Sequence, residues 1–229
     1  MIAHLRCGPL AQRGHALAVP PRGPGPRPSG MIILPITFIS RPPNPQSGCT
    51  VTASSYEREL KGILSGREDV LERVTKTCSE AQRTAYWSTQ SRPFIVTRAA
   101  ASIGVDLIAL RGDISFPLEV KASTHDVLRT SSNSGRETQQ AEDMMELCKA
   151  AGVLPIYAFR RKGVRGDSWR IFTLEMERPL GIAGFLHARL PKLRQTEKGN
   201  YVIEWESGMP LADFLRYLNS AVPSFTTSS

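Results

Sequence analysis

The chain of 229 residues has few cysteines and no long apolar run. The four cysteines are Cys7, Cys49, Cys78 and Cys148. They are far apart, show no C-x-x-C spacing and have no histidine at ligand spacing, so zinc sites and a disulfide framework are not expected. Reduced thiols in a cytoplasmic protein are the expectation. The most apolar segment, residues 31–39, is too short to span a membrane, which predicts no membrane partner.

Acidic residues and lysine are absent from residues 1–56, which hold five arginines and ten of the 17 prolines. Such a composition buries too little apolar surface to offset the entropy of ordering. We therefore predict a disordered Pro/Arg-rich leader over residues 1–53. So many prolines argue against an amphipathic transit peptide, whereas a DNA-contacting tail and a start at Met31 or later both stay open. The formal charge of +8 suits a polyanionic partner, but the remaining chain, with 24 Lys and Arg against 21 Asp and Glu, is only mildly basic.

A β-hairpin is predicted in the middle of the chain. Two apolar runs, residues 105–110 and 116–120, flank the sequence Arg-Gly-Asp-Ile-Ser. A two-residue loop over 112–113 would pair Arg111 with Ile114. This register fixes which residues of the two strands share a face.

The same register places Asp106 opposite Glu119, and the period of two puts Lys121 on the face of Glu119. Opposed carboxylates about 5 Å apart destabilise a sheet. A hard divalent cation such as Mg²⁺, which prefers oxygen ligands, would explain the cluster. The alternative is an edge hairpin whose exposed charges only keep the sheet soluble.

Elements around the hairpin are expected from periodicity and turn residues. Glu57 lies at the edge of the first apolar stripe, and Ser54-Ser55-Tyr56-Glu57 also fits a capping box. A basic loop, 160–166, would either contact phosphate or form a solvated tip, and the Ser-rich loop 130–135 would be mobile over the site. The expected helices are 56–64, 67–83, 138–151, which ends at a Gly152 C-cap, and 211–218; the expected strands are 94–98, 154–159, 169–174 and 201–205.

This order of elements, with Glu-Arg-Glu-Leu on the first helix, Val-Asp, Glu-Val-Lys and Trp-Arg-Ile-Phe, resembles the archaeal-type Holliday junction resolvases of the PD-(D/E)XK nuclease superfamily. The resemblance runs from about Tyr56 to Leu218. It implies an α/β, restriction-endonuclease-like fold, a mixed central sheet flanked by helices, over residues 54–220. Residues 67–90 would be an insertion relative to the family, and residues 221–229 a disordered tail.

The resemblance also implies a function. The chain would be a Mg²⁺-dependent endodeoxyribonuclease, with Mn²⁺ as a substitute, that resolves four-way DNA junctions by paired nicks as a homodimer in recombination and repair. Each cut would leave a 5′ phosphate and a 3′ hydroxyl. The expected location is cytoplasmic and nucleoid-associated. Two alternatives are another nuclease of the superfamily, acting in repair or restriction, and a catalytically disabled junction-binding protein.

Site residues follow from the resemblance position by position. The implied catalytic residues are Glu57, Asp106, Glu119 and Lys121, and the implied metal ligands are Glu57, Asp106, Glu119 and the carbonyl of Val120. The implied DNA contacts are Arg58, Arg98, Ser102, Arg129, Arg136 and Gln140. The interval of 49 residues from Glu57 to Asp106 exceeds that of the family, so the insertion at 67–90 could displace Glu57 from the metal.

Overall fold

The computed structural model describes residues 53–99, 104–130, 136–197 and 199–220. The chain divides into two units, residues 1–45 and 46–229, and every described residue belongs to the second. The predicted disordered leader, except for Ala53, the predicted tail and most of the Ser-rich loop lie outside the described residues. Among the helices that are described, none is both long and apolar enough to cross a membrane.

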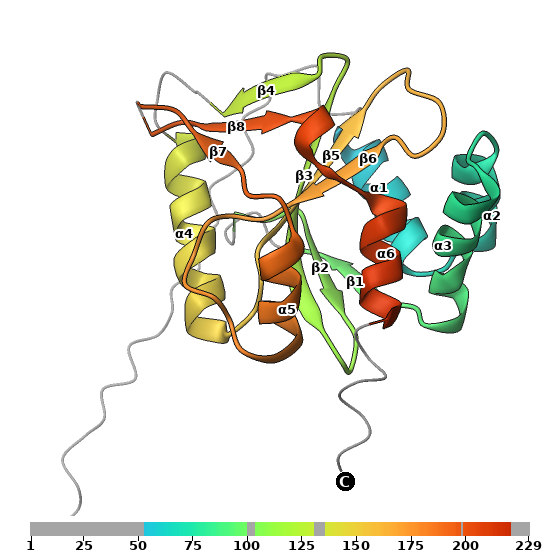
Figure 1. Cartoon of the computed structure of the whole chain (residues 1–229), viewed down its shortest axis with the longest axis horizontal. Coiled ribbons are helices and arrows are strands. Elements are labelled where there is room, and N and C mark those ends of the chain that lie inside the picture. The colour runs from blue at the N-terminus through green and yellow to red at the C-terminus, as the bar shows by residue number, and fades with distance from the viewer. Residues whose placement is uncertain (1–52, 100–103, 131–135, 198, 221–229) are drawn as a thin grey trace, which may run out of the picture. The chain divides into compact units, whose positions relative to one another are not determined.

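A mixed six-stranded sheet, in the order β1-β2-β3-β5-β6-β9, forms the centre of the fold (Figure 1). Only β3 and β5 run parallel; the other neighbours are antiparallel. A second sheet, in the order β4-β8-β7, has three strands. The strands are β1 Ile95–Arg98, β2 Leu107–Leu110, β3 Ser115–Ser123, β4 Val127–Thr130, β5 Ile156–Arg161, β6 Trp169–Phe172, β7 Arg194–Gln195, β8 Tyr201–Glu204 and β9 Met209–Pro210.

Helices cover both faces of the central sheet, with α4 on the side away from α1, α2 and α3 (Figure 1). The helices are α1 Ala53–Leu64, α2 Glu68–Thr75, α3 Glu80–Ser91, α4 Arg136–Ala151, α5 Gly181–Arg189 and α6 Leu211–Ser220. The larger core joins Leu60 of α1 and Phe214 of α6 to Leu118 of β3. The smaller core joins Met144 of α4 to Phe159 of β5. The predicted class, a mixed central sheet flanked by helices, is confirmed.

The predicted hairpin is confirmed, and so is its register between Leu107 and Leu110. The ladder runs from the pair Leu107 and Leu118 to the pair Leu110 and Ser115. Arg111 and Ile114 exchange two backbone hydrogen bonds of 3.1 Å each, so 112–113 is the two-residue loop. The hairpin therefore has a closed tip at 112–113 and an open end where β2 begins.

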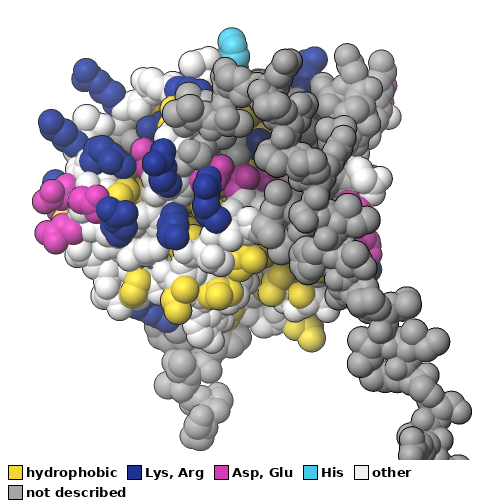
Figure 2. All heavy atoms as spheres, turned by 180° about the vertical axis from the view of Figure 1, so that it is seen from behind, with side chains coloured by type: hydrophobic (Ala, Val, Ile, Leu, Met, Phe, Trp, Pro, Cys, Tyr) yellow, Lys and Arg dark blue, Asp and Glu magenta, His cyan; other side chains and the backbone are white. Residues whose placement is uncertain are grey.

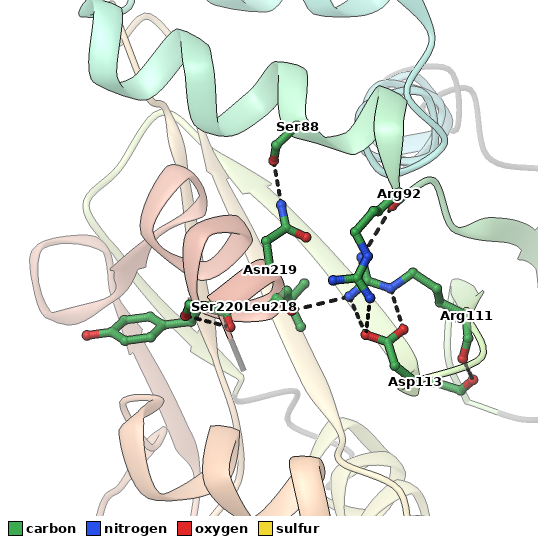
Figure 3. Close-up of polar contacts among 9 residues, drawn as sticks. Ser88, Arg92, Arg111, Asp113, Leu218, Asn219 and Ser220 are labelled. Carbon is green, nitrogen blue, oxygen red and sulfur yellow. Dashed lines mark hydrogen bonds and ion pairs between the residues drawn. The ribbon is translucent and has the colours of Figure 1, made fainter. Parts of the chain in front are cut away.

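A polar network holds the closed tip against two helices (Figure 3). The Arg111 guanidinium donates to both carboxylate oxygens of Asp113 and to the carbonyls of Arg92 and Leu218. Arg92 donates to the same carboxylate at 3.2 Å. The Arg111 guanidinium also lies 4.2 Å from the ring centre of Phe94. The tip is thus tied to the end of α3 and to the end of α6.

The single helix predicted over 67–83 is wrong. The chain forms α2 and α3, separated at Ser79. The Ser79 hydroxyl accepts from the Gln82 N–H at 3.3 Å, and the Gln82 side chain accepts from the Ser79 N–H at 3.0 Å. This capping box starts a new helix, because it satisfies N–H groups that a continuous helix would bond internally. Ala81, which lies within the predicted helix, is exposed.

Of the other local predictions, some are wrong and one is confirmed. The capping box at Ser54 is wrong, because α1 already begins at Ala53. Leu147, an apolar residue within the predicted helix 138–151, is 51% exposed. The C-cap at Gly152 is confirmed by its positive φ of 67°. The sequence patterns did not predict β4, β7, β9 or α5.

Candidate active site

Asp106 is fixed at the open end of the hairpin by three backbone contacts. Its carboxylate accepts a hydrogen bond of 2.7 Å from the Val120 N–H. Its own N–H donates to the Leu118 carbonyl, and its carbonyl accepts from the Ala99 N–H, each at 3.0 Å. The ladder ends at Leu107, so the expectation that Asp106 opposes Glu119 as a strand pair is wrong. Its carboxylate instead reaches across to the backbone of β3.

Glu119 and Lys121 lie on β3, the strand shared by the antiparallel and parallel parts of the sheet. The Lys121 Nζ lies 2.9 Å from a carboxylate oxygen of Glu119. The Glu119 side chain is 8% exposed and that of Lys121 is 26% exposed. The alternation of β3 thus gathers a buried carboxylate and a cation that reaches solvent, and the reading of these charges as exposed solubilising groups is wrong for Glu119.

The Val120 carbonyl points to the side of β3 on which Asp106 lies. An extended residue points its N–H and C=O to the same side of its strand. Because the Val120 N–H donates to Asp106, its carbonyl also points toward Asp106. The Val120 carbonyl therefore lies on the side of β3 that faces Asp106.

Glu57 of α1 contacts Arg98 at the end of β1. The Arg98 guanidinium donates through Nε, at 3.0 Å, and through Nη2 to one carboxylate oxygen of Glu57. The Glu57 side chain is 13% exposed. Leu60 and Ile63 of α1 pack in the main core with Leu107 of β2, which holds α1 against the hairpin. Glu57 and Arg98, which are 41 residues apart in sequence, therefore meet beside the hairpin.

Burial and the neighbouring charged groups shift the pKa of the Asp106 carboxylate. Burial raises the pKa above its usual value, and the nearby Glu57 carboxylate raises it further. The Val120 N–H, the Lys121 ammonium and the Arg98 guanidinium act in the opposite direction. These charged groups are therefore close enough to act on one carboxylate.

The hairpin end offers oxygen donors of the kind that a divalent cation requires. In the described part of the chain, no three His, Cys, Asp or Glu side chains are grouped as metal ligands. Two carboxylates, Asp106 and Glu119, and the Val120 carbonyl are oxygen donors of the kind that Mg²⁺ takes while keeping several waters. The residues present thus fit a cation held by two carboxylates. Glu57 is bound to Arg98 instead of completing a third ligand.

The predicted DNA contacts are divided among several elements. Arg58 of α1 is exposed, and Arg129 is exposed on β4, where it pairs with Val202 of β8. Gln140 of α4 donates to the Gly104 carbonyl at 2.8 Å, which supports the turn that leads into Asp106. Ser102 lies outside the described residues, as does the side chain of Arg136. Of these residues, as far as the structure describes them, Arg98 is the one that forms an ion pair with an acidic site residue, Glu57.

The basic loop after β5 is partly used within the protein. Arg160 binds Glu59 of α1 at 3.0 Å, and Arg161 pairs with Asp126. The Lys162 Nζ lies 5.4 Å from the ring centre of Tyr56. Arg165 is exposed. The loop therefore contacts α1 and is neither a purely solvated tip nor a row of unengaged cations.

Residues that the sequence patterns did not select line a hollow next to Glu57. Lys61 of α1 and Arg67, which precedes α2, line it together with Arg58 and Arg98. Lys61 follows Glu57 by one helical turn, which was an available signal for the same helix face. Arg67 gave no such signal, because its place depends on how α2 packs. Figure 2 shows Lys and Arg side chains gathered on this part of the surface.

No protein-family model matches the chain, and no curated protein does either. Among solved structures, the chain is similar to Hjc of Archaeoglobus fulgidus, a Holliday junction resolvase from an archaeal hyperthermophile. The identity is 21% and the TM-score is 0.36, over 54% of this chain and 82% of that chain. This likeness is too weak to assign a family or an activity, so the function is inferred from the chain's own site.

Proposed function

We propose that the chain is a Mg²⁺-dependent endonuclease with a PD-(D/E)XK-type site that resolves four-way DNA junctions. One observation carries the proposal. The Asp106 carboxylate is bonded to the backbone of Val120, the residue between Glu119 and Lys121. Two carboxylates, a carbonyl and an ammonium at the end of one hairpin suit phosphodiester hydrolysis better than they suit a structural role.

Phosphodiester hydrolysis needs an aligned water and stabilisation of the charge that develops on phosphorus-bound oxygens and on the leaving 3′ oxygen. Bound Mg²⁺ would supply positive charge at those oxygens. Asp106 and Glu119 would hold the cation together with the Val120 carbonyl. In this arrangement the Asp106 carboxylate keeps its backbone hydrogen bond through one oxygen and offers the other.

Lys121 would act on the substrate directly. Its ammonium is ion-paired with Glu119 yet partly exposed, so it can approach a phosphate without leaving the site. As a compact charge with three donors, it would orient the attacking water or stabilise the pentacovalent phosphorus. The water's oxygen bonds to phosphorus and releases a proton to solvent, the bond to the 3′ oxygen breaks, and that oxygen takes up a proton from solvent. The products are a 5′ phosphate and a 3′ hydroxyl.

Arg98 would help to position the scissile strand, and Glu57 would favour binding of the cation. Arg98 is 55% exposed and can contact a phosphate while it remains bonded to Glu57. Glu57 adds negative charge near Asp106, which favours a bound cation. Its direct ligation of the metal stays a prediction.

Two nicks related by a two-fold axis are needed to resolve a junction. A C₂ homodimer supplies two sites with that relation, and we propose this assembly. Arginine contacts to phosphates would bind DNA with little sequence preference and strong salt dependence. Selectivity would come from the branched shape.

A second candidate is a junction-binding protein that no longer cuts. The observation that favours it is the Arg98 contact, which engages the carboxylate expected as a third metal ligand. In this case Asp106 and Glu119 would hold a cation too weakly for turnover. Binding would then persist without cleavage.

A cleavage assay separates these candidates. The full chain is incubated with a four-way junction, a linear duplex of the same sequence and a splayed arm, each with Mg²⁺ or EDTA. Paired symmetric nicks in the junction alone, lost in EDTA, are the expected result. Equal cutting of all three DNAs would indicate a general nuclease, and tight binding without cutting would support the second candidate.

The variant Asp106→Asn tests the site itself. Removing one carboxylate charge should lower cleavage by at least about 10²-fold, while junction affinity stays within about threefold. Asp213→Asn on α6 is the control, because this Asp pairs with the neighbouring Arg216 at the surface. Unchanged cleavage in Asp106→Asn would refute the assignment.

A further inference from the structure

Two hollows lie on either side of α1 and share two lining residues. The first is lined by Glu57, Arg58, Lys61, Arg67 and Arg98, among others. The second continues past α1 toward α2 and has Arg58, Arg67 and Arg73 in its wall. Because Arg58 and Arg67 line both, the hollows are adjacent, and together they are here named the α1–α2 groove. The groove begins at Glu57 and Arg98, beside the candidate active site.

Positive charge dominates this groove. Its walls hold five cations, Arg58, Lys61, Arg67, Arg73 and Arg98. The acids in the walls are Glu57, Glu59 and Asp69, and each is bonded to a cation: Glu57 to Arg98, Glu59 to Arg160 and Asp69 to Arg67. Neither Lys61 nor Arg73 pairs with an acid in the described part of the chain. An anion entering the groove would therefore meet no uncompensated carboxylate apart from those of the active site.

Local sequence builds the groove by setting α2 close to α1. Gly66, with φ of 66°, ends α1, and the Arg67 N–H donates back to the Gly62 carbonyl at 3.0 Å. The chain then reverses, and Val70 of α2 packs on Gly62. A Cβ at Gly62 would lie 2.6 Å from a methyl group of Val70, so only glycine allows this approach. As a result, Arg67 and Arg73 line the same groove as Arg58.

The groove opens on the face that carries the site. In Figure 2, Lys and Arg side chains gather over the side where α1 and α2 lie. Apolar side chains are collected in a separate region of this face, below the basic one. Exposed cations that follow a path suit a linear polyanion, because each successive phosphate meets a charge.

We propose that the α1–α2 groove binds the sugar-phosphate backbone of a DNA arm that leaves the cleavage site, and that the inserted helix α2 extends this contact. The proposal rests on the proposed function. Arg67 and Arg73 would contact phosphates beyond those held by Arg58 and Arg98. The extension would strengthen binding to long arms without adding base contacts, so it would not change sequence preference.

The double variant Arg67→Ala/Arg73→Ala tests this role in the full chain. Its affinity for a four-way junction and for a linear duplex is measured in EDTA over a salt series. Affinity should fall about tenfold at low salt, and the slope of log K against log [salt] should decrease in magnitude by about 1 to 2, since each lost phosphate contact removes about 0.9. Shortening the DNA arms should reduce the difference from wild type.

A matched control is Lys76→Ala/Arg83→Ala. These two exposed cations belong to the same insertion but do not line the groove, so affinity should stay within about twofold. An equal loss in both variants would overturn the groove and indicate a general charge effect. Tight DNA binding by wild type with no loss in Arg67→Ala/Arg73→Ala would overturn the groove alone. Absence of DNA binding by wild type would overturn the proposed function together with it.

Discussion

Each end of the β2–β3 hairpin holds an aspartate carboxylate, and the pKa values of the two carboxylates are shifted in opposite directions. At the tip, Asp113 accepts from two arginines, and these bonds bring its pKa below the usual value although burial acts against them. At the open end, Asp106 accepts from one backbone N–H, and burial raises its pKa. The tip thus balances its carboxylate with the chain's own cations, whereas the open end keeps an excess of negative charge. We interpret the first end as structural and the second as the catalytic end.

The largest effect is expected from a change at the end of the hairpin that we propose to be catalytic. Lys121→Met keeps the length of the side chain but removes its charge. Cleavage of a junction should fall by roughly 10²- to 10³-fold, because the ammonium no longer stabilises charge on the transferred phosphate. Single-turnover kinetics with saturating Mg²⁺ would measure the loss. The free energy of unfolding should fall by less than about 2 kcal/mol, because Lys121 is partly exposed although its partner Glu119 is buried.

A fall in the free energy of unfolding of about 3 kcal/mol, as expected for Arg111→Ala, would contradict the comparison. Lys121 would then be a structural cation like Arg111. Lys149→Met is the control. This lysine pairs with Glu177 at the surface of α4 and should leave cleavage unchanged.

The next largest effect is expected from a change at the structural end of the hairpin. Arg111→Ala removes the donors to Asp113, to two carbonyls and the contact with Phe94. Because the two side chains are only 10% and 13% exposed, the free energy of unfolding should fall by about 3 kcal/mol. Urea denaturation would measure it. Cleavage per folded molecule should remain within about twofold.

Arg67→Ala is a matched control for stability. Arg67 and Asp69 are also two residues apart and form the same two-donor contact, but their side chains are 63% and 62% exposed. The expected change is below about 1 kcal/mol. Equal losses in both variants would show that burial does not distinguish the tip.

The smallest effect concerns pH at the tip. Folding lowers the pKa of Asp113, so its carboxylate stabilises the fold fully above its unfolded pKa of about 4 and loses this effect as pH falls through the folded pKa. Asp113→Asn removes the titration. The difference in unfolding free energy between wild type and Asp113→Asn should therefore narrow as pH is lowered below about 4. Denaturation curves between pH 7 and pH 3 would show it, and a constant difference would exclude the carboxylate as the source.

The hairpin could be predicted because its signals are local. Alternating apolar residues and the loop at 112–113 set the register, and the register follows from a few neighbouring residues. The break between α2 and α3 was also local but was missed. The apolar spacing from Val70 to Ala81 suggested one helix, and the capping box at Ser79 overrode it.

The sequence by itself determined the mixed sheet with flanking helices and the presence of Asp106, Glu119 and Lys121 at one end of a hairpin. Only the tertiary structure decided that Asp106 bonds to Val120 and that Glu57 contacts Arg98 across 41 residues. The α1–α2 groove also depended on it, since the groove requires Val70 to pack on Gly62. The physical reason is that backbone periodicity reports which face a residue occupies, whereas contacts between elements depend on packing that the periodicity does not encode.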